Sequence, residues 1–151
     1  MSKTSDEIEH AVRSALSDDP RLPFNDEIAV DVYHGVVTLR GTVGSFGQER
    51  AAVAAARRQP GVEDVYDQLQ VRLLDADRRV DADIRGEALQ LLLDDPMLDA
   101  DYLDVRVKDA WVTLTGQADR QFQSDKAFEH MLNLRGVTGV TNEITVDKRL
   151  P

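Results

Sequence analysis

The chain has 151 residues, of which 42% are hydrophobic, so it can form one ordinary domain or two very small ones. It contains no cysteine, which excludes disulfides, thiolate metal sites and a cysteine nucleophile. Its 28 acidic residues outnumber its 18 basic ones, and a net charge of −10 disfavours binding to nucleic acid or anionic lipid by the molecule as a whole, although a local basic face can still exist.

The first predicted element is an amphipathic helix close to the N-terminus. Thr4 and Glu7 have the spacing of a capping box, and Asp18-Asp19-Pro20 predicts the end of the helix. Apolar residues recur at helical spacing between these two signals, at Ile8, Val12, Ala15 and Leu16.

A β-hairpin is predicted next. Residues 28–32 and 37–39 alternate between apolar and polar side chains, and His34-Gly35 between them offers a two-residue turn. Gly41 ends the hairpin.

A second helix and a last strand complete this half of the chain. Ser45 and Gln48 can cap the helix, and Gly61 ends it. The inner face of the helix is formed by alanines, at Ala52, Ala55 and Ala56. The strand carries its apolar residues at Val65, Leu69 and Val71.

The second half of the chain repeats this pattern. At an offset of 76 residues Asp18-Asp19-Pro20 falls on Asp94-Asp95-Pro96, and at an offset of 75 Val36–Gly41 falls on Trp111–Gly116. Further matches place Ile8 on Ile84, Val30 on Val105, Val32 on Val107, Gly61-Val62 on Gly136-Val137, Val65 on Val140 and Val71 on Val146. So many spaced coincidences indicate two copies of one supersecondary unit. The second hairpin has Asp109-Ala110 at its turn, a poorer pair than one that contains glycine.

The repeated order predicts an α+β fold with two tandem αββαβ units. The strand–helix–strand step must be a right-handed crossover, which places two helices on one face of a three-stranded mixed sheet and leaves the other face open. We expect domains at residues 1–73 and 80–148, with a linker at about 74–79.

Both copies match the motifs of a known family. Gly35–Gly41 reads Gly-Val-Val-Thr-Leu-Arg-Gly, Ala52 lies in the second helix, and Gly61-Val62 leads into the last strand. The second copy keeps Val112–Gly116 and the segment from Gly136 to Ile144. In these residues the chain resembles the BON (bacterial OsmY and nodulation) domain family over nearly its whole length.

The resemblance implies a function as well as a fold. It implies a non-enzymatic module that binds phospholipid or a membrane interface and is linked to osmotic or envelope stress, and one BON-containing relative is thought to bind potassium. The second copy departs from the family at Ala110 and Trp111, where glycine and a small β-branched residue are usual. Many relatives are exported, whereas this N-terminus contains no apolar signal-peptide segment and no apolar run reaches the ~20 residues of a membrane span, so we expect a cytoplasmic protein that can lie at a membrane surface.

The open sheet faces carry the first group of candidate binding residues. Val112 and Leu114 should point beneath the helices, so Trp111 on the same strand should lie on the open face. By the same alternation, Arg106 and Lys108 join it in the second copy, and Tyr33 and Tyr66 lie on the open face of the first. An exposed tryptophan is an interface candidate, and for Trp111 we favour contact with the other copy or another chain over insertion into a membrane.

Charged residues supply two further candidate sites. Arg50, Arg57 and Arg58 share one face of the second helix of copy one and could contact anionic lipid, although such faces are usually solvated. Asp99, Asp101 and Asp104 are weak candidates for a metal site, because the spacing fits no EF-hand and the nearby Asp-Asp-Pro motif is typical of helix termination. Potassium could also bind to backbone carbonyls.

No motif of an enzyme or of a cofactor site is recognised. His10, His34 and His130 have no metal-binding or catalytic spacing, and there is no glycine-rich phosphate loop. We therefore predict a tandem binding module that contacts a phospholipid surface or an envelope-associated partner. The alternatives are a sensor of potassium or calcium and a structural homo-oligomer joined through the open sheet faces.

Overall fold

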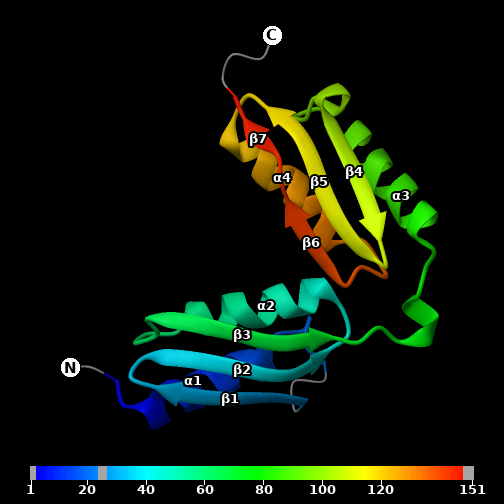
Figure 1. Cartoon of the computed structure of the whole chain (residues 1–151). Coiled ribbons are helices and arrows are strands. Elements are labelled where there is room, and N and C mark those ends of the chain that lie inside the picture. Colours follow the sequence, from blue (N-terminus) through cyan, green and yellow to red (C-terminus); the bar gives the residue numbers. More distant parts are fainter. Residues whose placement is uncertain (1–2, 24–26, 148–151) are drawn as a thin grey trace. The chain divides into compact units, whose positions relative to one another are not determined.

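The computed structural model describes residues 3–23 and 27–147, and the chain divides into two compact units, Met1–Arg72 (unit 1) and Leu73–Pro151 (unit 2). Unit 1 contains α1 (Ser5–Asp18), β1 (Ile28–Tyr33), β2 (Val36–Val43), α2 (Phe46–Arg57) and β3 (Asp64–Val71). Unit 2 contains η2 (Asp75–Asp77), α3 (Asp81–Asp94), η3 (Ala100–Tyr102), β4 (Leu103–Lys108), β5 (Trp111–Ala118), α4 (Gln121–Leu132), β6 (Gly139–Asn142) and β7 (Thr145–Val146). The predicted α+β class and the twofold αββαβ order are confirmed (Figure 1).

The strand that carries the repeated hexapeptide lies at the centre of each sheet. In unit 1, β2 pairs with β1 in antiparallel and with β3 in parallel orientation, with Val37 opposite Val65. In unit 2, β5 pairs in the same way with β4 and β6, with Val112 opposite Val140. Both sheets are therefore mixed, as the strand–helix–strand crossover requires.

One face of each sheet is covered by the two helices of its own unit (Figure 1). The core of unit 1 includes Val12, Leu16, Val30, Val37, Leu39, Ala52 and Ala56, and the core of unit 2 includes Ile84, Leu92, Val105, Val112, Leu114 and Met131. Buried and less buried residues alternate along β2 and β5. The side chains between the buried ones therefore face away from the helices. The hydrophobic effect thus gives both hexapeptides the same inner row of side chains.

The predicted helix signals make the expected contacts. The Thr4 hydroxyl accepts a hydrogen bond from the Glu7 amide at 3.2 Å, and the Ser45 hydroxyl accepts one from the Gln48 amide at 3.1 Å. Asp19 and Asp95 follow the ends of α1 and α3, and each carboxylate accepts an amide two residues further on. The Asp-Asp-Pro motifs therefore terminate helices, as predicted.

The last strand of unit 2 differs from the prediction, because the structure divides it into β6 and β7. The Asn142 side chain accepts the Ile144 amide at 3.0 Å and donates to the Ser124 hydroxyl on α4 at 2.9 Å. Asp67 makes the equivalent amide contact in unit 1, where β3 continues without a break. The additional bond to α4 distinguishes the interrupted strand from the continuous one.

Part of the predicted linker packs within unit 2. Arg79 Nη1 donates to Glu87 Oε2 at 2.6 Å and to the Arg135 carbonyl at 3.2 Å. Gly136 has a φ of +84°, and a Cβ atom there would lie 2.6 Å from the Asp77 carbonyl. The segment before α3 is thus part of the folded unit, whereas the predicted domain limits at residues 1 and 148 lie outside the described residues.

Candidate functional site: the open face of unit 2

A tight turn places Trp111 at the start of β5. Asp109 and Ala110 have positive φ values of 51° and 65°, so the hairpin uses a turn that normally favours glycine or asparagine. The carboxylate of Asp81, the first residue of α3, accepts the amides of Asp109 and Ala110, each at 2.9 Å. The helix therefore fixes the turn directly before Trp111.

The indole of Trp111 lies on the open sheet face, as the alternation predicts. The residue is 47% exposed, and its Nε1 donates a hydrogen bond to the Thr141 hydroxyl on β6 at 2.8 Å. Gly139 lies opposite Trp111 in the parallel pair of β5 and β6 and is buried beneath the ring.

A groove of about 890 Å³ lies beside this indole, and we call it the Trp111 groove. Its lining residues are Arg85, Arg106, Val107, Lys108, Asp109, Trp111 and Thr113. It brings together three residues that the sequence selected, Trp111, Arg106 and Lys108. The lining contains three cationic side chains and one carboxylate, in a molecule whose net charge is −10.

Arg85 is the member of this groove that the sequence did not reveal. It lies on α3, next to the buried Ile84, and its Nε donates to the Val105 carbonyl of the edge strand β4 at 2.7 Å. Its guanidinium also pairs with Asp104 at 3.0 Å, while Arg106 pairs with Glu143 at 3.7 Å. These pairs are exposed and therefore weak, so both arginines can exchange their partners for an anion.

The open face of unit 1 is different in composition. Val36 stands at the position equivalent to Trp111, and Arg40 pairs with Asp31 across the sheet. Tyr33 and Tyr66 are 75% and 57% exposed, but they lie on the two outer strands with β2 between them. The two predicted tyrosines therefore share a face without forming one cluster.

The predicted basic face on α2 is exposed but lies on the helical side of unit 1. Arg50 and Arg57 belong to α2, and Arg58 follows its last turn. The structure thus assigns the predicted basic residues to two separate surfaces, α2 in unit 1 and the open sheet face in unit 2.

Beside these arginines, α2 and β3 carry a pair of carboxylates. Burial, and after it the negative charge of Asp67, raise the pKa of Glu49 to about 7, although the positive charge of Arg50 lowers it. The equivalent residues of unit 2 are Ser124 and Asn142, which form a hydrogen bond instead.

Unit 2 also contains a histidine–carboxylate pair that sequence analysis missed. His130 Nε2 on α4 lies 2.7 Å from Asp95 Oδ2, and Lys126 lies 3.7 Å from the same oxygen. The hydrogen bond from His130, followed by the bond from the Met97 amide, lowers the pKa of the buried Asp95. The partners are 35 residues apart, so no local spacing could have indicated the pair.

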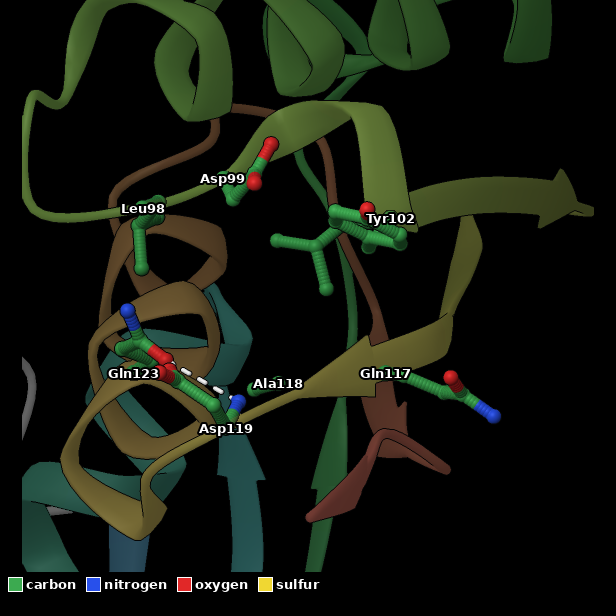
Figure 2. A pocket seen from close by; sticks show the side chains of 8 residues that line it. Leu98, Asp99, Tyr102, Gln117, Ala118, Asp119 and Gln123 are labelled. Carbon is green, nitrogen blue, oxygen red and sulfur yellow. Dashed lines mark hydrogen bonds between the residues drawn. The ribbon is translucent and has the colours of Figure 1, made fainter. Parts of the chain in front are cut away.

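The predicted metal candidates are not gathered into a ligand set. Asp104 binds Arg85 and the Val105 amide. Asp99 lines a pocket of about 130 Å³ at the end of the sheet, together with Tyr102 and Asp119, whose amide donates to the Gln123 side chain (Figure 2). Across residues 3–23 and 27–147, no three His, Cys, Asp or Glu residues are arranged to hold a metal ion.

The helices of the described part of the chain are all too short or too polar to cross a bilayer.

Comparison with known proteins places both units in one family. The model of the BON domain matches residues 4–72 and 80–148. Osmotically-inducible protein Y of Escherichia coli (strain K12) is 34% identical over 139 residues, which cover 88% of this chain and 68% of that protein.

Solved structures that match the chain in the structural comparison include two of CdsD, a structural protein of the type III secretion system of Chlamydia trachomatis. Its C-terminal domain is 9% identical, with coverage of 99% of this chain and 100% of that chain and a TM-score of 0.40. A second CdsD structure is 12% identical, with coverage of 91% and 90% and a TM-score of 0.33.

Proposed function

Since the chain belongs to the BON domain family and has one BON domain in each half, we propose that it is a non-enzymatic module that binds an anionic phospholipid surface through the Trp111 groove. The observation that carries this proposal is the gathering of Arg85, Arg106 and Lys108 in one groove beside an exposed indole. The osmotically inducible relative supports a role in osmotic stress, which forms part of the proposal.

The charges of the groove favour such binding. A basic residue close to an anionic membrane contributes about 1 kcal/mol, so three contribute about 3 kcal/mol, or roughly a hundredfold in affinity. Asp109 and the acidic remainder of the molecule oppose this attraction. The binding must therefore be local and must orient unit 2 with its open face toward the lipid.

Co-sedimentation of the full chain with vesicles tests the proposal. Wild type should pellet with vesicles that contain phosphatidylglycerol at low ionic strength and remain in solution with pure phosphatidylcholine. The double variant Arg106→Gln/Lys108→Gln removes two charges from the groove, so its affinity should fall by about 2 kcal/mol, or roughly 30-fold.

The matched control is Arg57→Gln/Arg58→Gln, which removes the same charge from α2 of unit 1. It should bind within about threefold of wild type, since the proposal assigns the lipid contact to the groove and both arginines lie outside it. Equal losses in both double variants would show that total charge, and not the groove, determines binding. A third outcome is that wild type does not bind vesicles but forms a dimer, and that Trp111→Ala abolishes the dimer. The partner of the groove would then be a second copy of the chain.

A further inference from the structure

The indole of Trp111 lies flat against the backbone of β6. A Cβ atom built on Gly139 would lie no farther than 2.5 Å from Cζ3, Cε3 and Cη2 of the indole. These are three consecutive atoms of the six-membered ring. A point that is almost equally distant from all three lies over the face of the ring, since a point beyond its edge would be much closer to one atom than to the others. Gly139 therefore leaves the space that the ring face occupies.

A second contact fixes the direction of the ring. Nε1 donates to the Thr141 hydroxyl at 2.8 Å, and Thr141 follows Gly139 by two residues on the same face of β6. The six-membered ring lies over Gly139 while the pyrrole N–H reaches Thr141, so the indole extends along the strand. Its only polar hydrogen is already bonded, and the residue is still 47% exposed.

This arrangement belongs to unit 2 alone. At the positions equivalent to Trp111, Gly139 and Thr141, unit 1 has Val36, Asp64 and Tyr66. Asp64 and Tyr66 would occupy the space that the ring requires. The three residues of unit 2 therefore act together: Trp111 provides the ring, Gly139 leaves space beneath it, and Thr141 accepts its N–H.

We infer that Gly139 and Thr141 are positioning residues that hold Trp111 as a rigid platform at the level of the phospholipid headgroups, so that the ring does not enter the acyl chains. This inference rests on the proposed function. A ring that inserts must project from the surface, whereas this one lies along the sheet over β6. Arg106 and Lys108 stand on β4, on the other side of β5, and their long cationic side chains reach the phosphates beside the ring. Because the ring is fixed before binding, little rotamer freedom is lost on contact.

Trp111 is the only tryptophan of the chain, so its fluorescence reports on this site in the full-length protein. With phosphatidylglycerol vesicles, binding should reduce quenching by aqueous iodide, whereas bromine atoms deep in the acyl chains should leave the emission nearly unchanged. In solution, Thr141→Val should lower the fluorescence anisotropy, since the ring loses its acceptor. Its vesicle affinity should fall about threefold to tenfold, the cost of ordering one mobile side chain.

Two further variants separate positioning from general damage to the fold. Thr141→Ser keeps the hydroxyl and should restore both anisotropy and affinity, while Thr145→Val makes the same change as Thr141→Val elsewhere on the open face and should behave as wild type. Gly139→Ala should displace the ring more strongly than Thr141→Val does. If the alanine variant fails to fold, the threonine variants decide the question.

The outcomes distinguish this inference from the function on which it rests. Wild type that does not bind phosphatidylglycerol vesicles would overturn the proposed function, and the platform role with it. Wild type that binds with strong quenching by the acyl bromines would overturn the platform alone. So would a Thr141→Val variant with the anisotropy and affinity of wild type.

Discussion

At the scale of single residues, the turn before Trp111 is a local conflict that another element resolves. Ala110 has a φ of 65°, a left-handed conformation that costs a residue with a Cβ atom about 1–2 kcal/mol. Asp81 compensates by accepting both amides of the turn, and the Ala110 carbonyl accepts the Thr138 amide at 2.9 Å. The turn before the indole is thus stabilised by residues of other elements, and not by the residue types of the turn itself.

Removing this support should destabilise unit 2. Asp81→Ala should lower its free energy of unfolding by about 1.5–3 kcal/mol, because two hydrogen bonds to a charged acceptor are lost. Ala110→Gly should raise it by about 0.5–1 kcal/mol, since the relief of strain exceeds the entropy cost of glycine. Urea unfolding followed by Trp111 emission measures unit 2 specifically, as unit 1 has no tryptophan.

Ser5 occupies the position of Asp81 in unit 1, where the hairpin turn contains Gly35. Ser5→Ala is therefore the matched control. Followed by circular dichroism, which reports on both units, it should change the free energy of unfolding of unit 1 by less than about 0.5 kcal/mol. If Asp81→Ala were as mild as this control, the carboxylate would not support the turn.

At the scale of the elements, the sequence predicts what depends on neighbours along the chain. Alternation placed Trp111, Arg106 and Lys108 on one face. The caps at Thr4 and Ser45 and the first hairpin turn, with Gly35, also follow local rules. The sequence did not predict contacts between elements, such as those of His130 with Asp95 or of Arg85 with the edge strand β4. Those contacts depend on how each helix is rotated and shifted against the sheet, which periodicity leaves open.

The contact between α2 and β3 shows how equivalent elements of the two units have different energetics. Glu49 faces Asp67 in unit 1, where unit 2 has the hydrogen-bonded Ser124 and Asn142. The raised pKa of Glu49 means that the folded chain binds this proton more tightly than the unfolded chain does. Unit 1 should therefore lose stability as the pH rises from about 4.5 through about 7, and regain it as the pH falls.

Transplanting the pair of unit 2 tests this pH dependence. Glu49→Ser/Asp67→Asn should stabilise unit 1 at about pH 8 by roughly 1–2 kcal/mol, a value kept small because solvent screens a partly exposed carboxylate. Its stability should also change less than that of wild type between about pH 5 and pH 8. Thermal unfolding followed by circular dichroism at several pH values makes the comparison.

Glu63→Gln removes an exposed carboxylate from the same unit and serves as the control. We expect its stability to change with pH as steeply as that of wild type. A double variant that keeps the wild-type slope would assign the pH dependence to other groups.

At the scale of the whole molecule, the cores suggest that each unit can fold without the other. The buried hydrophobic cluster at the core of unit 1 is formed by residues between Ile8 and Leu69, all of which belong to that unit. Units of about 70 residues seldom have more than 3–5 kcal/mol of net stability, so a few contacts at a boundary decide whether a fragment is stable. Arg79 makes such contacts, although the sequence assigned it to the linker.

Two fragments that differ only in this segment test where unit 2 begins. Residues 73–151 should unfold cooperatively at the urea midpoint that Trp111 reports in the full chain and should retain vesicle binding. Residues 80–151 should be less stable by about 1–2 kcal/mol, because the fragment lacks the Arg79 bonds to Glu87 and to the Arg135 carbonyl. Arg79→Ala within fragment 73–151 should reproduce most of that loss. A fragment 73–151 that unfolds far below the midpoint of the full chain would show instead that unit 2 depends on unit 1, and docking between the two units would then become the better account of the exposed indole.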